Sequence, residues 1–130
     1  MVTSVETHAT SIGVAVLEKG GNAVDAAVAV AYALAVTHPS AGNIGGGGFM
    51  MVHDAKTGNS VALDFREVAP SKATRDMYLD AKGNVVDGKS LYTHYAVGVP
   101  GTVAGMEHAL KSWGTLPLSR VIAPAIELAD

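Results

Sequence analysis

One long apolar segment constrains this chain more than any other feature. Residues 23–36 read as a helix that is apolar nearly all round, with Asn22 as its N-cap and Asp25 where a carboxylate suits the helix dipole. His38-Pro39 ends the helix, because the residue before a proline is driven out of the helical region. A helix without a polar face is buried on several sides, so we expect it to lie inside a larger assembly.

The composition indicates a packed core made from small side chains. Hydrophobic residues make up 48% of the 130 residues, aromatic residues 5% and charged residues 16%, which excludes a disordered chain or a coiled coil. The net charge of −3 offers no basic excess for binding a nucleic acid. Without cysteine, the chain has no disulfide, thiolate zinc site or cysteine nucleophile. Its longest purely apolar run, Ala26–Val36, is shorter than the roughly 20 residues of a membrane-spanning helix.

Periodicity and turn residues predict the other elements. Gly20-Gly21 ends a first helix, and turn residues at 56–59 join two strands into a β-hairpin. The stretch between this hairpin and Pro100 reads as irregular surface, and Pro124 starts a new turn or kinks the last helix. The predicted helices cover residues 9–19, 23–36, 101–113 and 118–130, and the predicted strands cover 49–53 and 60–65.

Two glycine motifs invite a nucleotide-binding interpretation. Residues Gly83–Ser90 match the phosphate-loop pattern G-x-x-x-x-G-K-[ST]. Such a loop needs a buried strand before it and a helix after it, and this sequence offers neither, so we interpret it as a polar surface turn. The run Gly45–Gly48 lacks the dinucleotide-binding spacing and follows a helix instead of a strand. We expect its backbone to approach another segment or a ligand closely.

Arg66 is the candidate binding residue. It ends the second predicted strand, where alternation puts Asp64 and Arg66 on one face and Glu67 on the other. Its forked guanidinium could hold a carboxylate, but a structural ion pair with Asp64 or Glu67 is commoner, and position alone favours the ion pair. The five histidines lack metal-ligand spacing, and no G-x-S-x-G elbow of a serine hydrolase is present.

Six segments carry a more specific pattern and cover nearly the whole chain: Gly20–Ala29, Val36–Pro39, Gly42–Met50, Asp64–Pro70, Val99–Gly105 and Pro124–Ala129. In this order they resemble the N-terminal part of the large subunit of γ-glutamyltransferases, also called glutathione hydrolases. The resemblance implies an α+β fold, the four-layer α-β-β-α sandwich of N-terminal-nucleophile hydrolases. This chain would supply two helices, a β-hairpin, an irregular segment and two further helices of that sandwich.

The resemblance also implies a mechanism. Family members cut their own precursor, and the small subunit that results begins with the catalytic threonine, whose α-amine can act as base for its hydroxyl. The hydroxyl attacks a γ-glutamyl amide, and the acyl-enzyme passes to water or to an acceptor amine. No Thr-Thr-His segment of the kind that opens the small subunit is present. We therefore expect residues 1–130 to be a partial large-subunit domain, truncated at the C-terminus and also at the N-terminus, with no catalytic residue and no activity alone.

One substrate-binding residue of the family maps onto this chain. The family's D-x-R-E-x-A-P segment places its carboxylate-binding arginine at Arg66, which reverses the preference for an ion pair. The resemblance further implies γ-glutamyl substrates such as glutathione, the chain's own small subunit as partner and no metal or organic cofactor. It implies a periplasmic or extracellular location, although no signal peptide opens these residues. The alternatives are a related acylase acting on cephalosporin or poly-γ-glutamate, a nucleotide-binding module using Gly83–Ser90, and a non-catalytic assembly fragment.

Overall fold

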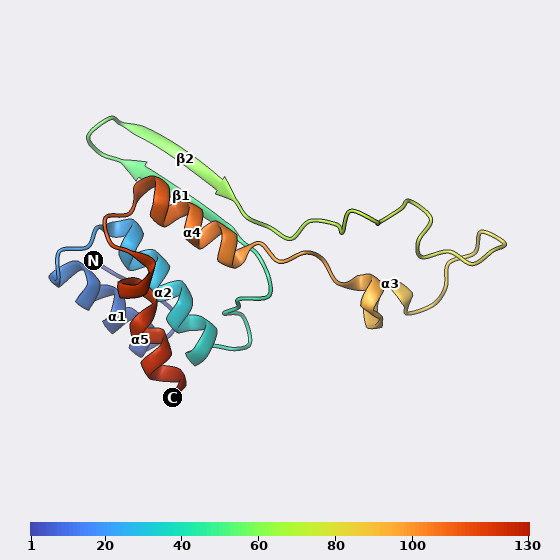
Figure 1. Cartoon of the computed structure of the whole chain (residues 1–130), viewed down its shortest axis with the longest axis horizontal. Helices are drawn as coiled ribbons and strands as arrows, with labels where there is room; N and C mark the ends of the chain where they lie inside the picture. Colours follow the sequence, from blue (N-terminus) through green and yellow to red (C-terminus); the bar gives the residue numbers. More distant parts are fainter.

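The computed structural model describes all 130 residues, as a body of helices and a β-hairpin from which a long arm projects (Figure 1). Every predicted helix and strand is present, with its ends within two residues of the expected positions. The helices are α1 (Thr7–Glu18), α2 (Ala23–Thr37), α3 (Lys89–Tyr92), α4 (Thr102–Trp113) and α5 (Leu118–Ala129), with one 3₁₀ turn at His94–Ala96. The strands are β1 (Phe49–Asp54) and β2 (Asn59–Asp64).

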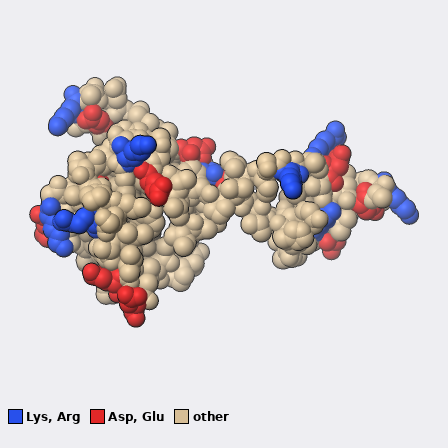
Figure 2. Space-filling model, in the orientation of Figure 1, with Lys and Arg blue, Asp and Glu red and all other residues tan.

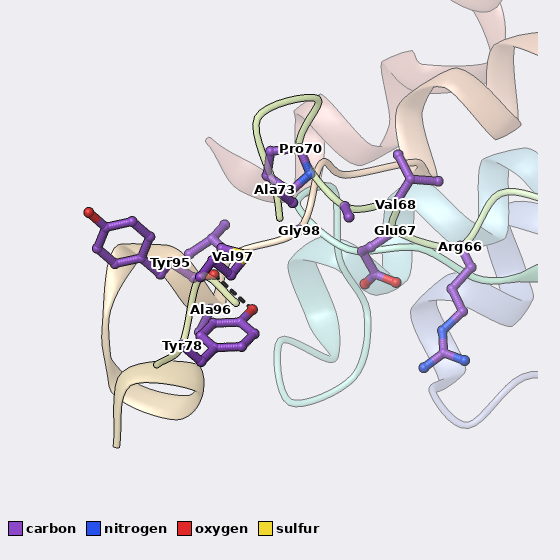
Figure 3. Close-up of a pocket in the computed structure, with 12 residues that line it drawn as sticks. Arg66, Glu67, Val68, Pro70, Ala73, Tyr78, Tyr95, Ala96, Val97 and Gly98 are labelled. Carbon is purple, nitrogen blue, oxygen red and sulfur yellow. Dashed lines mark hydrogen bonds between the residues drawn. The ribbon is translucent and has the colours of Figure 1, made fainter. Parts of the chain in front are cut away.

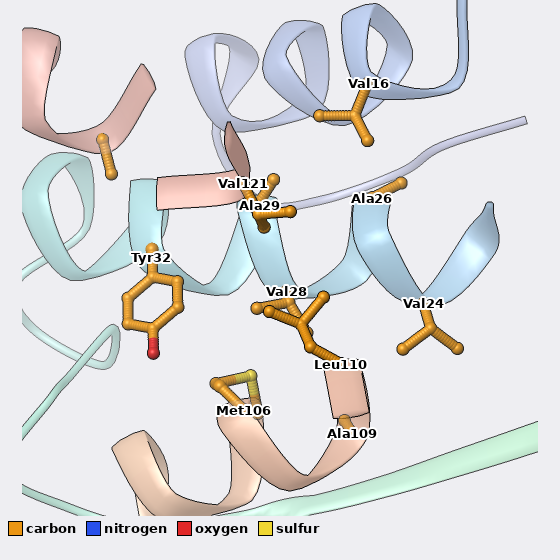
Figure 4. Close-up of a cluster of buried hydrophobic side chains, with 11 residues drawn as sticks. Val16, Val24, Ala26, Val28, Ala29, Tyr32, Met106, Ala109, Leu110 and Val121 are labelled. Atoms are coloured by element: carbon orange, nitrogen blue, oxygen red, sulfur yellow. The ribbon is translucent and has the colours of Figure 1, made fainter. Parts of the chain in front are cut away.

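Helix α2 lies at the centre of the body, as its apolar sequence predicted. It contacts α1, α4 and α5, so neighbours cover several of its sides. Figure 4 shows Val28 of α2 facing Met106 and Leu110 of α4, while Ala29 lies beside Val121 of α5. Val28, Ala29 and Val121 are completely buried. Full burial of one valine stabilises the fold by about 1.5–3 kcal/mol, and the intervening alanines let the helices approach closely.

The β-hairpin covers one side of α4. Strands β1 and β2 pair in antiparallel register from Phe49–Asp64 to Asp54–Asn59, and the turn between them contains Gly58 in the left-handed region. Alternation along β1 turns Met50 toward the helices, where it packs against the core, and leaves Met51 exposed on the opposite face. The predicted α+β class is confirmed: one two-stranded sheet lies against a layer of helices.

Residues 67–99 form the arm, which Figure 2 shows as a separate lobe with Lys, Arg, Asp and Glu side chains on its surface. At its root, Val68 and Val99 form an isolated antiparallel bridge with backbone hydrogen bonds of 2.8 and 3.3 Å. Further out, the Tyr78 hydroxyl donates a 3.1 Å hydrogen bond to the carbonyl of Tyr95. Side chains along the arm are mostly exposed, as predicted for an irregular surface stretch.

The match to a phosphate loop, Gly83–Ser90, is a surface turn. The carboxylate of Asp80 accepts the backbone N–H groups of Lys82 and Asn84 at 2.8 and 2.9 Å, which fixes the tight reversal before it. No strand leads into the segment, and α3 behind it has only four residues. A helix this short cannot present the aligned N-terminal amides that a phosphate requires.

One of the two alternatives expected at Pro124, a new first turn, is not found in the last helix. Helix α5 continues through Pro124 instead of starting a new first turn there. Its hydrophobic side packs on α2 through Val121 and Ala125, both buried, and this burial offsets the hydrogen bond that proline cannot donate. None of the helices combines the length and the apolar character that crossing a membrane requires.

Candidate functional site

Arg66 lies two residues beyond the end of β2, where the chain passes from the body into the arm. The ladder continues one residue past the strand, because the Phe65 N–H donates to the carbonyl of Gly48 at 3.1 Å. The N–H of Arg66 donates to the Asp64 carboxylate at 2.9 Å. Figure 3 shows the Arg66 side chain extending away from the arm, and the residue is exposed.

The ion pair considered for Arg66 is absent. The structure contains one salt bridge, between Arg75 and Asp76 in the arm, and none from Arg66 to Asp64 or Glu67. Asp64 instead accepts a hydrogen bond from the backbone N–H of Arg66, so its carboxylate binds the backbone of Arg66 and not the guanidinium. The five N–H donors of this guanidinium are free to bind a carboxylate through two parallel hydrogen bonds.

Glycines from two distant segments enclose the backbone that carries Arg66. A Cβ atom on Gly47 would lie 2.7 Å from the carbonyl oxygen of Phe65 and 2.8 Å from the Cα of Arg66. A Cβ atom on Gly101, at the start of α4, would collide with the same carbonyl of Phe65. The close approach predicted for the glycine run is therefore confirmed, and the segment it approaches is the one that carries Arg66.

Hydrogen bonds hold these two glycine segments together. The carbonyl of Gly46 accepts the N–H groups of Gly101 and Thr102 at 2.8 and 3.0 Å, which satisfies donors at the start of α4. The side-chain oxygen of Asn43 accepts the Gly46 N–H at 2.9 Å and the Thr102 hydroxyl at 2.6 Å. The loop at 43–48 is thereby fixed to the start of α4, and both lie close to the backbone of Phe65 and Arg66.

The sequence did not single out Asn43 or Thr102. A threonine after Pro-Gly at the start of a helix was a visible sign of helix initiation. Its hydrogen-bond partner, however, lies 59 positions away, and no local pattern connects the two. Thr102 is only 6% exposed, so its hydroxyl needed an acceptor from another segment.

Asp25 does more than cap α2. Its carboxylate completes the capping box by accepting the Asn22 N–H at 2.8 Å. It also accepts the Thr115 hydroxyl at 2.7 Å and the backbone N–H groups of Thr115 and Leu116 at 3.0 and 3.1 Å. Burial raises the pKa of this carboxyl, but the hydrogen bonds from Thr115, Asn22 and Leu116 outweigh it and hold the pKa below its ordinary value.

Arg66 borders two surface hollows at the junction of body and arm. The larger one, shown in Figure 3, is lined by Glu67, Pro70, Tyr78 and Val97 among others. The smaller one is lined by residues of α4, such as Ala104 and His108, as well as by Arg66. The site thus offers the Arg66 guanidinium, with its hydrogen-bond donors unpaired, at an accessible surface. No three His, Asp or Glu side chains gather as metal ligands.

Known proteins resemble this chain over nearly its whole length. A family model described as gamma-glutamyltranspeptidase matches residues 9–130. The glutathione hydrolase proenzyme of Escherichia coli K12 is 62% identical over 129 residues, which cover 99% of this chain and 22% of that protein. The crystal structure of Helicobacter pylori gamma-glutamyltranspeptidase shares 59% identity and a TM-score of 0.93, covering 100% of this chain and 37% of that one. A cephalosporin acylase from Bacillus halodurans has a TM-score of 0.74 at 31% identity, covering 92% and 22%.

This chain therefore spans about a fifth (22%) of the length of the curated relatives it matches. The family match begins in α1 and runs to the end of α5, so it includes the glycine loop, Arg66 and the start of α4. The resemblance read from the six sequence segments is confirmed over nearly the whole chain. The chain belongs to the γ-glutamyltranspeptidase family.

Proposed function

We propose that the protein to which this chain contributes transfers and hydrolyses γ-glutamyl groups, with glutathione as one substrate. Arg66 is the observation that carries this proposal: its guanidinium has no ionic partner, and two glycine segments fix its backbone. It stands in the D-x-R-E-x-A-P segment of a chain 62% identical to a glutathione hydrolase proenzyme. Residues 1–130 act in this proposal as a partial large-subunit domain that supplies one end of the substrate site.

The nucleophile in this proposal comes from outside residues 1–130. A precursor cuts itself, and the new N-terminal threonine of the small subunit attacks the γ-glutamyl carbonyl carbon. Its α-amine takes the hydroxyl proton and returns a proton to the leaving amine as the amide C–N bond breaks. Water or an acceptor amine then releases the γ-glutamyl group from the ester. The word proenzyme in the names of relatives supports such processing. We also propose that the protein acts in the periplasm or outside the cell.

Arg66 binds the α-carboxylate of the γ-glutamyl donor through two parallel charge-assisted hydrogen bonds. Lysine would keep the charge but not the fork, so Arg66→Lys is also costly. Removing one partner of such a pair costs about 2–5 kcal/mol of binding free energy, by analogy with interfacial charge pairs. This energy corresponds to a loss of roughly thirty-fold to several-thousand-fold in kcat/KM. Because the carboxylate is remote from the scissile amide, much of the loss falls on KM.

The test compares a γ-glutamyl anilide with the same donor lacking its α-carboxylate, using the full-length protein. Arg66→Ala should lower kcat/KM for the first donor only. Arg75→Ala is the matched control, since this arm arginine is 96% exposed, and it should leave both donors unaffected. Equal losses on both donors would show that Arg66 does not recognise the carboxylate, and the assignment would be wrong.

A related acylase activity is the second candidate. The Bacillus halodurans cephalosporin acylase shares the fold of this chain at 31% identity, which supports an acylase of the same superfamily. Wild-type full-length protein distinguishes the two functions directly. A preference for a cephalosporin side chain or for poly-γ-glutamate over the γ-glutamyl anilide would replace the main proposal with this one.

A further inference from the structure

We infer that Asn43 and Thr102 are positioning residues for Arg66, and that their hydrogen bond helps the enzyme select donors with an α-carboxylate. The inference rests on the proposed function. It starts from the free guanidinium: since no acidic side chain holds Arg66, the position of its backbone sets the point from which the side chain reaches a substrate. Whatever fixes that backbone therefore fixes the anchor point of the carboxylate-binding side chain.

Two glycine segments lie against the backbone of Phe65 and Arg66. A Cβ atom on Gly47 would overlap the carbonyl of Phe65 and the Cα of Arg66, and a Cβ atom on Gly101, at the start of α4, would overlap the same carbonyl. The contacts leave no room for even one methyl group on either glycine. A small separation of the two glycine segments would therefore open space in which the Arg66 backbone could shift.

Asn43 and Thr102 close this enclosure through side chains. The Thr102 hydroxyl donates to the Asn43 side-chain oxygen at 2.6 Å, and the Gly46 N–H donates to the same oxygen at 2.9 Å. Thr102 is buried, so water does not readily replace its partner. The backbone bonds from Gly101 and Thr102 to Gly46 lie beside this pair and depend on the same spacing. Asn43 thus links the glycine loop to α4 at the level of Arg66.

Losing this link should affect carboxylate recognition before it affects chemistry. A displacement of about 1 Å at a positioning group can cost up to about a hundredfold in rate. Thr102→Val keeps the shape and removes the hydroxyl, while Thr102→Ser keeps the hydroxyl. We expect Thr102→Val to raise KM for the carboxylated donor about tenfold with little change in kcat, and Thr102→Ser to stay near wild type.

The experiment uses the full-length enzyme, the γ-glutamyl anilide and the same anilide lacking the α-carboxylate. The variants are Thr102→Val, Thr102→Ser, Arg66→Ala and the double variant Arg66→Ala/Thr102→Val. Thr57→Val is the control, because this exposed hydroxyl also donates a hydrogen bond, to Asp54 in the hairpin turn. If Thr102 acts through Arg66, the double variant loses no more than Arg66→Ala alone.

Asn43→Ala removes the acceptor at the other end of the hydrogen bond, in a half-buried loop that tolerates change better than the core. It should show the same donor-dependent loss, so the test does not depend on one variant folding. Equal losses on both donors, or an additional loss in the Arg66→Ala background, would overturn the inference and leave the proposed function standing. A wild-type enzyme indifferent to the α-carboxylate would overturn both.

Discussion

Asp25→Asn should detach the loop between α4 and α5 from the start of α2. Four donors converge on this fully buried carboxylate: the N–H groups of Asn22, Thr115 and Leu116, and the Thr115 hydroxyl. An amide retains one acceptor oxygen and presents an NH₂ group where the other oxygen stood. The Thr115 hydroxyl can rotate and accept a hydrogen bond from the new NH₂ group. The unavoidable loss is therefore one backbone hydrogen bond, together with the negative charge that strengthens the remaining hydrogen bonds.

The expected destabilisation is about 2–4 kcal/mol. Hydrogen bonds to a charged acceptor contribute about 1.5–3 kcal/mol each, and a buried donor left without a partner costs about 1–3 kcal/mol. At about 1.4 kcal/mol per tenfold, the opening equilibrium of the loop should rise roughly thirty-fold to a thousand-fold. The change should be local first, because the loop is held to α2 mainly at this carboxylate and at Asn22, whose amide donates to the Trp113 carbonyl.

Hydrogen exchange followed by mass spectrometry measures this opening in the full-length protein. Peptides covering residues 110–118 should exchange faster in Asp25→Asn, and the melting temperature should fall. Asp87→Asn removes an exposed carboxylate of the arm and should change neither quantity. If Asp25→Asn matched Asp87→Asn in both measurements, the carboxylate would not hold the loop, and the reasoning from its hydrogen bonds would be refuted.

Three further predictions concern acid stability, nucleotide binding and the isolated chain. The pKa of Asp25 is held below its ordinary value, so its stabilisation is complete above about pH 4 and is lost as the pH falls through the folded-state pKa. The difference in melting temperature between wild type and Asp25→Asn should therefore narrow in acid, and a constant difference would contradict this. Calorimetry with ATP and magnesium should show no heat beyond that of dilution, because Gly83–Ser90 lacks a preceding strand and a long following helix. A micromolar affinity for ATP that Lys89→Ala abolishes would overturn this prediction. Residues 1–130 alone should release no aniline from a γ-glutamyl anilide, since the sequence contains no Thr-Thr-His segment; measurable release would refute this prediction.

Local chemistry determined the elements of this fold. Gly20-Gly21 provides the left-handed position that ends α1, Asn22 caps α2, and His38-Pro39 stops α2 within a residue of the expected end. The hairpin followed from alternation and turn residues in the same way. At Pro124 no new first turn begins: α5 continues through the proline and packs against α2. Helix caps, turn residues and alternation act between neighbours in sequence, so the sequence alone reveals them.

The candidate site was only half visible in the sequence. The resemblance pointed to Arg66, whereas its position alone favoured an ion pair that the structure does not contain. Asp25 could be read as a helix cap, but its donors at Thr115 and Leu116 lie some 90 residues away. The partnership of Asn43 with Thr102 was not visible at all.

The sequence by itself thus determined the helices, the hairpin, the family and the identity of the candidate carboxylate-binding arginine. Tertiary structure alone decided what surrounds that arginine: Gly47 and Gly101 lie close to its backbone, and its guanidinium forms no ion pair. The physical reason is the range of the interactions. Helix caps, turns and hydrophobic periodicity depend on residues close together in sequence. Close packing and buried hydrogen bonds depend on which distant segments the hydrophobic core brings together.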